Sequence, residues 1–149
     1  MRSASYRASW LRIPTFRGVL LPPIIDIHIH ITPMEGFMPE AQELIKRGRK
    51  DFDGAVRFAA SPREFLKLRD GAEIGRAGLI NYVSPEVIGF TTEVNEWVTH
   101  YCQADPKRLL AFGSVHSKYV ANPGAEVGRT KKIGIRPKSA SVAPAVCAQ

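Results

Sequence analysis

A regular alternation of polar and β-branched residues stands out near the start of the chain, from Ile24 to Ile31. Isoleucine occupies positions 24, 25, 27, 29 and 31, and polar side chains fill the places between them. A period of two residues with this β-branched content predicts a β-strand. Pro22-Pro23 precedes the segment and Thr32-Pro33 follows it, and these prolines limit the strand to this stretch.

Beyond residue 33, apolar positions take helical spacing in some segments and strand-like spacing in others. Ser61-Pro62-Arg63-Glu64 has the form of a capping box with proline at the first helical position, which predicts a helix start. Asp105-Pro106 and Gly134 are typical of element ends. We expect helices over residues 39–47, 62–70, 92–103 and 122–132, and strands over 78–83 and 109–115, with a further strand beginning at 135.

This order of strands and helices predicts an α/β fold. Strands that are separated by helices run parallel, because a helical crossover returns the chain to the same end of the sheet. The 149 residues suffice for one domain with one hydrophobic core. We expect that domain over residues 23–136, after a basic, disordered leader over 1–22 and before a disordered tail over 137–149.

The excess positive charge of the chain is confined to its two ends. The formal net charge is +7, yet residues 1–22 carry four arginines and no acid, and residues 128–149 carry five basic residues and no acid. The stretch between them holds all 14 acidic residues and is mildly acidic. Because no aromatic–basic interleaving or known binding motif accompanies the charge, we expect no nucleic-acid partner.

Composition also limits the class of protein. Apolar residues make up 44% of the chain and charged residues 23%, which is typical of a globular protein. No apolar run approaches the roughly 20 residues that cross a bilayer, so we expect no membrane partner. Only two cysteines, Cys102 and Cys147, are present, which excludes a disulfide scaffold and a cysteine-rich zinc finger. We interpret the leader as an unstructured segment rather than an organellar transit peptide, and expect a cytoplasmic protein.

Asp26, His28 and His30 are the polar residues of the first predicted strand, and alternate residues of a strand share one face. Residues two apart are separated by about 6.5 Å along a strand, so two imidazoles that lean together can reach one ion. Neutral imidazole binds zinc and similar metals, and a carboxylate can hold a ligand histidine in the required tautomer. The isoleucines share the opposite face, where a helical layer could bury them. The alternative, histidines that face solvent or form structural hydrogen bonds, is less favoured with three ligand-type side chains on one face.

The segment from Ile24 to Pro33, IIDIHIHITP, resembles the opening strand of the metal-dependent amidohydrolase superfamily, especially its amidohydrolase-related branch. The segment from Gly78 to His116, with GLINYVSPEVIGFTTEVNEWV and DPKRLLAFGSVH, is similar to the second and third βα units of that branch. The branch contains hydrolases and decarboxylases related to aminocarboxymuconate semialdehyde decarboxylase. The resemblance covers roughly residues 24–136 and implies a partial (β/α)₈ TIM-type barrel, about its first three βα units.

The resemblance also implies a site at the carboxyl ends of the strands. By this resemblance His28 and His30 are metal ligands, zinc is the expected metal, and Asp26 supports the ligands. The implied activity is hydrolysis of an amide- or ester-like bond in a small-molecule substrate by a metal-activated water. The family completes its site with a histidine on a later strand and with an aspartate on the last strand that acts as general base. Neither position exists in this sequence, so no catalytic residue is assigned.

Several alternatives remain open. A full barrel takes about 250 residues, so we interpret the chain as truncated or frameshifted near Arg136-Pro137. A non-oxidative decarboxylase of the same superfamily uses the same first-strand ligands and is the alternative activity. An inactive fragment that self-associates as a homo-oligomer through open strand edges is the alternative to an enzyme. His116, just after the predicted strand 109–115, is a candidate substrate contact, against the alternative of a loop histidine without a role.

Overall fold

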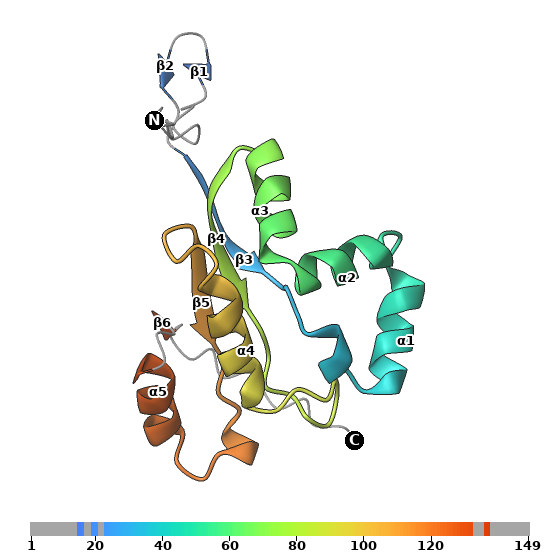
Figure 1. Cartoon of the computed structure of the whole chain (residues 1–149). Helices are drawn as coiled ribbons and strands as arrows, with labels where there is room; N and C mark the ends of the chain where they lie inside the picture. Colours follow the sequence, from blue (N-terminus) through green and yellow to red (C-terminus); the bar gives the residue numbers. More distant parts are fainter. Residues whose placement is uncertain (1–14, 17–18, 21–22, 133–135, 138–149) are drawn as a thin grey trace, which may run out of the picture.

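The computed structural model describes residues 15–16, 19–20, 23–132 and 136–137 of the chain (Figure 1). These residues form a mixed α/β structure around a parallel sheet, which confirms the fold class predicted from the sequence. The strands follow one another in space in the order in which they occur in the chain. They are β3 (Ile24–Ile29), β4 (Ile74–Ile80), β5 (Leu109–Gly113) and the two-residue β6 (Arg136–Pro137).

Helices connect successive strands of this sheet, which allows neighbouring strands to run parallel. Three α-helices lie between β3 and β4, and one lies in each of the next two connections. They are α1 (Pro39–Gly48), α2 (Phe52–Ala60), α3 (Pro62–Gly71), α4 (Glu93–Cys102) and α5 (Pro123–Lys132), with the short 3₁₀ turns η1 (Met34–Gly36) and η2 (Ser117–Tyr119). The wider barrel that the resemblance implies stays a prediction.

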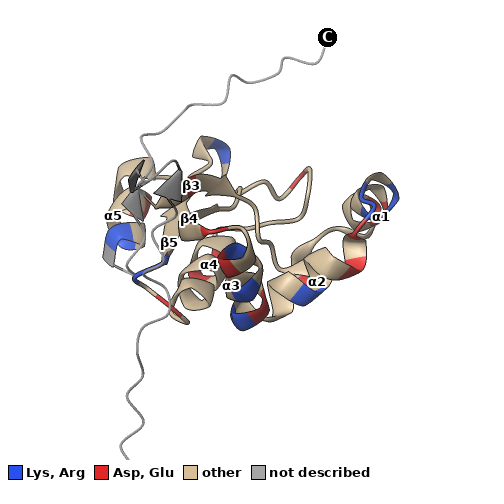
Figure 2. Ribbon diagram, turned by 90° about the horizontal axis from the view of Figure 1, so that it is seen from above, with Lys and Arg blue, Asp and Glu red and all other residues tan. Residues whose placement is uncertain are grey.

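The main hydrophobic core lies between the sheet and helices α3 and α4. Figure 2 shows both helices on the same side of the sheet. Alternate residues of β4 and β5 point toward them, and the side chain of Leu79 is fully buried against Phe65 of α3 and Val98 of α4 in this cluster. The cluster is completed by Ile31, Met34, Ala59, Ala77, Tyr101, Cys102, Leu109 and Ala111.

Buried polar side chains fix α4 relative to its neighbours. The Asn95 side chain is fully buried; its amide nitrogen donates to the Ser114 carbonyl at 2.9 Å, and its oxygen accepts from the Ser114 amide at 3.0 Å. The Tyr101 hydroxyl donates to the Phe58 carbonyl at 2.6 Å. Because an unpaired buried polar group costs free energy, these pairs favour one position of α4 against β5 and α2.

β3 is one of the two outer strands of the described sheet, and its isoleucines are less buried than the alternation predicts. Ile29 and Ile31 pack in the main core. Ile25 is 51% exposed and Ile27 61% exposed, so the expectation of one buried isoleucine face is wrong for these two residues. The register of β3 against β4 shifts between Ile24 and Ile25 and again between Asp26 and Ile29. These irregularities interrupt the alternation of faces that a regular strand would have.

Local signals predict several element ends and miss others. The Ser61 hydroxyl accepts the Glu64 amide at 3.3 Å, so Ser61 caps the start of α3 as predicted. The reciprocal half of the capping box does not form, because the Ser61 amide donates to the Arg57 carbonyl and the Glu64 carboxylate accepts from Lys67. The sequence analysis misses α2, whose first turn is capped by the Asp51 side chain. β4 ends at Ile80, so the last three residues of the predicted strand 78–83 belong to the following connection.

The segment expected as a disordered leader contains two short strands. β1 (Thr15–Phe16) and β2 (Val19–Leu20) pair antiparallel, so these four residues depart from the prediction. The rest of the leader, and the predicted tail from residue 138 onward, lie outside the described residues. No helix among the described residues has both the length and the apolar content to span a bilayer.

Candidate metal centre

His28 and His30 lie at the carboxyl end of β3, where the sequence predicts a metal site. His28 is the penultimate residue of the strand, and His30 directly follows its last residue. The two rings meet edge to face with their centroids 4.9 Å apart, and the two Nε2 atoms are 3.0 Å apart. The structure therefore brings the two predicted ligands together, with the same ring nitrogen of each converging on one place.

A backbone carbonyl of β4 fixes the His30 ring. Nδ1 of His30 lies 2.7 Å from the carbonyl oxygen of Ile80. A carbonyl oxygen only accepts hydrogen bonds, so Nδ1 carries the proton in this contact and Nε2 keeps its lone pair. This is the tautomer in which Nε2 can bind a metal, and metal-binding histidines commonly donate their second nitrogen to such an oxygen.

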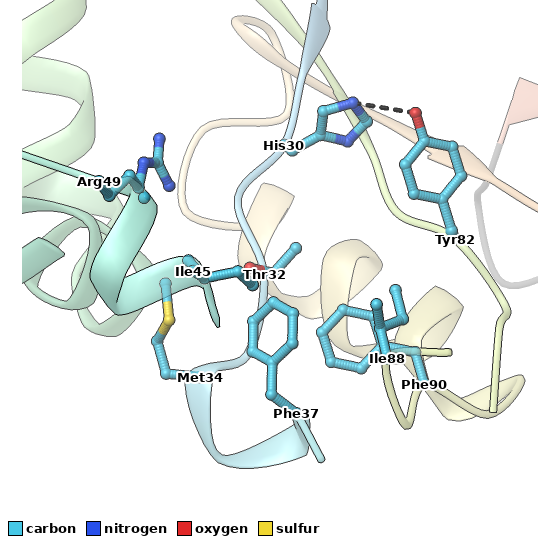
Figure 3. Close-up of a pocket in the computed structure, with 10 residues that line it drawn as sticks. His30, Thr32, Met34, Phe37, Ile45, Arg49, Tyr82, Ile88 and Phe90 are labelled. Atoms are coloured by element: carbon cyan, nitrogen blue, oxygen red, sulfur yellow. Dashed lines mark hydrogen bonds between the residues drawn. The ribbon is translucent and has the colours of Figure 1, made fainter. Parts of the chain in front are cut away.

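Tyr82 is a third side chain at the histidine pair. Its hydroxyl oxygen lies 3.1 Å from Nε2 of His30, and the two ring centroids are 4.8 Å apart (Figure 3). With Nε2 unprotonated, the phenol is the donor in this hydrogen bond. Tyr82 is 49% exposed, so its hydroxyl lies at the boundary between the pair and solvent.

The spacing of the two imidazoles fits a zinc ion. Two nitrogens that bind one tetrahedral zinc at bond lengths of about 2.0–2.1 Å are about 3.3 Å apart. The Nε2 atoms lie 3.0 Å apart, which is the length of a hydrogen bond between the two rings, so binding of one zinc by both would move them about 0.3 Å apart. Within the part of the chain that the structure describes, no group of three or more His, Cys, Asp or Glu residues gathers around a metal position. His28 and His30 are two side chains of the type that zinc binds.

Among the described residues, the Asp26 carboxylate forms its hydrogen bonds with groups other than the histidine rings. Asp26 pairs with Ala77, a residue of the helix-facing core, and its Oδ2 accepts the guanidinium of Arg69 on α3 at 2.6 Å. Its Oδ1 accepts the backbone amide of His28 at 3.2 Å. The prediction that Asp26 shares a face with both histidines is therefore wrong, because the register shift after Asp26 breaks the alternation. The carbonyl of Ile80, rather than Asp26, orients the His30 ring.

The contacts of Asp26 hold it as a carboxylate that links β3 to α3. Burial by itself opposes ionisation. The hydrogen bonds from Arg69 and from the His28 amide, together with the charge of Arg69, outweigh burial and lower the pKa of Asp26 below its ordinary value of 3.8. Through its ion pair with Arg69, Asp26 thus holds β3, the strand that carries the histidines, against α3.

His116 lies just after the carboxyl end of β5, as the sequence predicts. It follows β5, and its Nδ1 accepts the backbone amide of Lys118 at 3.3 Å at the start of η2. Its ring packs against Tyr119 with centroids 4.8 Å apart. His116 does not line the cavity beside His30. Its substrate role stays a prediction, and the structure gives it a local capping contact.

A cavity of about 420 Å³ opens beside His30. It lies between the exit of β3, helix α1 and the connection that follows β4 (Figure 3). His30 and Tyr82 border it on one side, and Arg49 lies on another. This volume is within the range of small-molecule sites. The apolar lining is formed by Met34, Phe37, Ile45, Ile88 and Phe90.

A glycine in the connection after β4, Gly89, allows the wall of this cavity to form. Gly89 has a φ of 94°, a conformation that favours glycine. A Cβ atom at Gly89 would lie 2.9 Å from both the carbonyl oxygen of Gly36 and the amide nitrogen of Met38. The carbonyl of the preceding residue, Ile88, accepts the Met38 amide at 3.0 Å. The connection after β4 therefore packs directly against the chain that follows β3.

The sequence analysis does not single out Ile80, Tyr82 or Arg49. The contact of Ile80 is made by its backbone, so its side-chain identity gives no signal. Tyr82 falls within the segment 78–83 that the apolar pattern predicts as strand, and Arg49 follows a helix whose end is commonly basic. Their proximity to His30 depends on tertiary packing.

Comparison of the chain with protein-family models, with curated proteins and with solved structures found no match in any of the three.

Proposed function

We propose that the chain is a metal-dependent hydrolase of the amidohydrolase-related type that acts on an amide- or ester-like bond of a small molecule. The observation that carries this proposal is the convergence of His28 and His30, with Nε2 atoms 3.0 Å apart, while His30 Nδ1 is bonded to Ile80. A divalent cation such as zinc, when bound, lowers the pKa of water from about 15.7 to about 7 and polarises a carbonyl group.

In this proposal the residues of the chain bind the metal and the substrate and orient them. His28 and His30 present ring nitrogens from one strand end, and the Ile80 carbonyl keeps the His30 proton on Nδ1. With a metal bound at His30 Nε2, the Tyr82 hydroxyl at 3.1 Å would lose the lone pair to which it donates, and this hydroxyl would then donate to a polar group of the substrate. The apolar side chains of the cavity exclude water from the bound substrate, which strengthens polar interactions there.

The place of the site in the fold supports the proposal. The histidine pair follows β3, and the Ile80 carbonyl and Tyr82 come from the end of the parallel neighbour β4. Ligands of α/β proteins commonly bind outside the carboxyl ends of parallel strands. A cavity large enough for a small molecule adjoins the pair at this end.

Zinc titration of the metal-free chain tests the metal site. We expect saturable binding of one zinc per chain, and loss of this binding in His28→Gln and in His30→Gln. His100→Gln is the matched control, because His100 is an exposed histidine on α4. Zinc binding by both site variants at the level of the wild type would contradict the proposed site.

A product assay tests the reaction. With esters and anilides of apolar acids, we expect release of alcohol or amine that a chelator abolishes and added zinc restores. Release of carbon dioxide from a carboxylated substrate would identify the decarboxylase alternative instead. A chain that turns over neither class and elutes as a multimer would favour the self-associating fragment, for which the exposed Ile25 and Ile27 offer an apolar surface.

A further inference from the structure

The cavity beside His30 has two chemically different ends. His30 and Tyr82 border one end, and Arg49 lies across the cavity from them (Figure 3). The apolar lining lies below these polar side chains in Figure 3, and within it Phe37 and Phe90 have ring centroids 4.6 Å apart. A ligand that fills this space therefore meets apolar side chains along its length and a cation at one end.

The end of α1 places Arg49 at the cavity. The helix ends at Gly48, and the Arg49 amide donates to the Ile45 carbonyl at 3.0 Å, which holds its backbone against the last turn. Among the described residues, no carboxylate forms an ion pair with the Arg49 guanidinium. By contrast, Arg69 and Arg108 each bind an aspartate, at 2.6 and 2.5 Å. Arg49 is thus a cation beside an apolar cavity with its donors available to an anionic group of a ligand.

We propose that this cavity binds a small molecule with an apolar body and one carboxylate, the carboxylate at Arg49 and the opposite end at His30 and Tyr82. The apolar body gains from leaving water against the rings of Phe37 and Phe90. The carboxylate forms charge-assisted hydrogen bonds with the guanidinium, whose planar donors match its two oxygens. The proposal that such a molecule binds here is supported by the cavity alone. That the ligand is the substrate rests on the proposed function; the substrate class is then an amide or ester whose apolar part ends in a carboxylate.

Titration of the metal-free, full-length chain with octanoate and with octanol, followed by NMR, separates the contribution of the charge from that of the apolar body. The two ligands share an alkyl chain and differ in the head group. We expect octanoate to bind about tenfold more tightly than octanol, as one charge-assisted contact predicts. In Arg49→Gln we expect both ligands to bind with the affinity that octanol has for the wild type.

Two control variants make the test specific. Arg47→Gln removes another arginine of α1, one that does not line the cavity, and is expected to keep the wild-type preference for octanoate. His28 does not line the cavity either, so His28→Gln is expected to lose zinc and to keep octanoate. Failure of the metal proposal and failure of the cavity proposal therefore give different results.

Three results would overturn the cavity proposal. The first is equal affinity of the wild type for octanoate and octanol. The second is the absence of binding of either ligand. The third is an equal loss of octanoate affinity in Arg47→Gln and Arg49→Gln, which would show attraction by the general charge of α1 rather than by a site. Circular dichroism of each variant establishes that the chain titrated is folded.

Discussion

Two neighbouring strands, β3 and β4, are both rich in apolar residues but differ in burial. The last four residues of β4 are all buried. In β3, Ile24, Ile25 and Ile27 are 52%, 51% and 61% exposed. β4 lies between two strands and packs against α3, whereas β3 pairs with β4 alone in the described sheet. The position of a strand in the sheet, rather than its own apolar pattern, therefore decides how deeply its side chains are buried.

The groups of the candidate metal centre come from both the exposed and the buried strand. The exposed strand carries His28 and His30, and its buried neighbour supplies the Ile80 carbonyl that orients one of them. A ligand nitrogen must be accessible to a cation from solvent, whereas the group that orients the ligand must be rigid. β3 meets the first requirement and β4 meets the second.

Substitution of a buried apolar residue of β4 gives the largest effect that we expect. Leu79→Ala removes a fully buried side chain from the centre of the core and leaves a cavity, so the free energy of unfolding should fall by about 3 kcal/mol. Ile27→Ala, the comparison on β3, removes apolar atoms that are largely in water and should cost less than about 0.5 kcal/mol. Urea denaturation measures both; equal losses would contradict the difference in burial between the strands.

Substitution of Gly78, where β4 packs closely against β3, should have the next largest effect on the free energy of unfolding. A Cβ atom at Gly78 would lie 2.6 Å from the Phe112 ring and 3.0 Å from the Cα and carbonyl oxygen of Ile27. Gly78→Ala therefore forces β3 and β4 apart, and we expect a loss of about 2 kcal/mol in the free energy of unfolding. Zinc affinity should fall as well, because His30 is oriented by β4.

Gly71→Ala is the matched control for this prediction. No heavy atom lies within 4 Å of a Cβ atom built at Gly71, at the end of α3. Alanine has a higher helix propensity than glycine, so stability should stay the same or rise by about 0.5 kcal/mol. A Gly78→Ala chain that is as stable as Gly71→Ala would show that β3 can shift without cost.

The sequence predicts those parts of the fold that depend on local signals. The apolar alternation marks β3, and proline and the basic last turn mark α1. The stretch Phe52–Ala60 also places Phe52, Ala55 and Ala59 at helical spacing, so α2 has a signal that the sequence analysis overlooked. The order of strands follows from the βα rhythm.

The geometry of the site is less accessible from the sequence. That His28 and His30 converge follows from their spacing on one strand, and this part is predictable. That Asp26 does not share a face with the histidines cannot be predicted from the sequence. It results from the register shift between Asp26 and Ile29, which depends on pairing with β4. A backbone group such as the Ile80 carbonyl leaves no trace in residue identity. Tertiary pairing therefore decides which group supports a ligand.

The free energy of unfolding should also depend on pH through Cys102, the last residue of α4, which is buried in the main core. We expect this effect to be smaller than those above. Burial raises the pKa of the Cys102 thiol from 9.0 to about 12. In the unfolded chain the thiol ionises near its ordinary pKa, so the folded state binds the proton more tightly and stability falls as pH rises above about 9. We expect a loss of about 1 kcal/mol at pH 10 relative to pH 8 from this group.

Denaturation of the wild type and Cys102→Ala at pH 8, 9 and 10 measures this contribution. The variant is expected to be less stable at every pH, because it loses buried atoms, but its stability should fall less between pH 8 and 10. Tyr101, whose pKa burial also raises, is present in both chains, so the difference in slope reports Cys102. Identical slopes would show that the thiol is accessible to solvent in the folded chain.

The two histidines of the exposed strand should have the smallest effect on folding and should differ from each other. His30→Gln loses the ring contact with the Ile80 carbonyl, at 2.7 Å, so we expect a cost of about 0.5–1 kcal/mol. The His28 side chain is exposed and has no such bond to β4, so His28→Gln should change stability by less than about 0.5 kcal/mol. Measured without metal, this difference reports the contacts of His30 with Ile80 and Tyr82, since both variants lose the contact between the two histidine rings. Equal stabilities would mean that the carbonyl of β4 does not hold the ring, and that the division of tasks between the two strands is wrong.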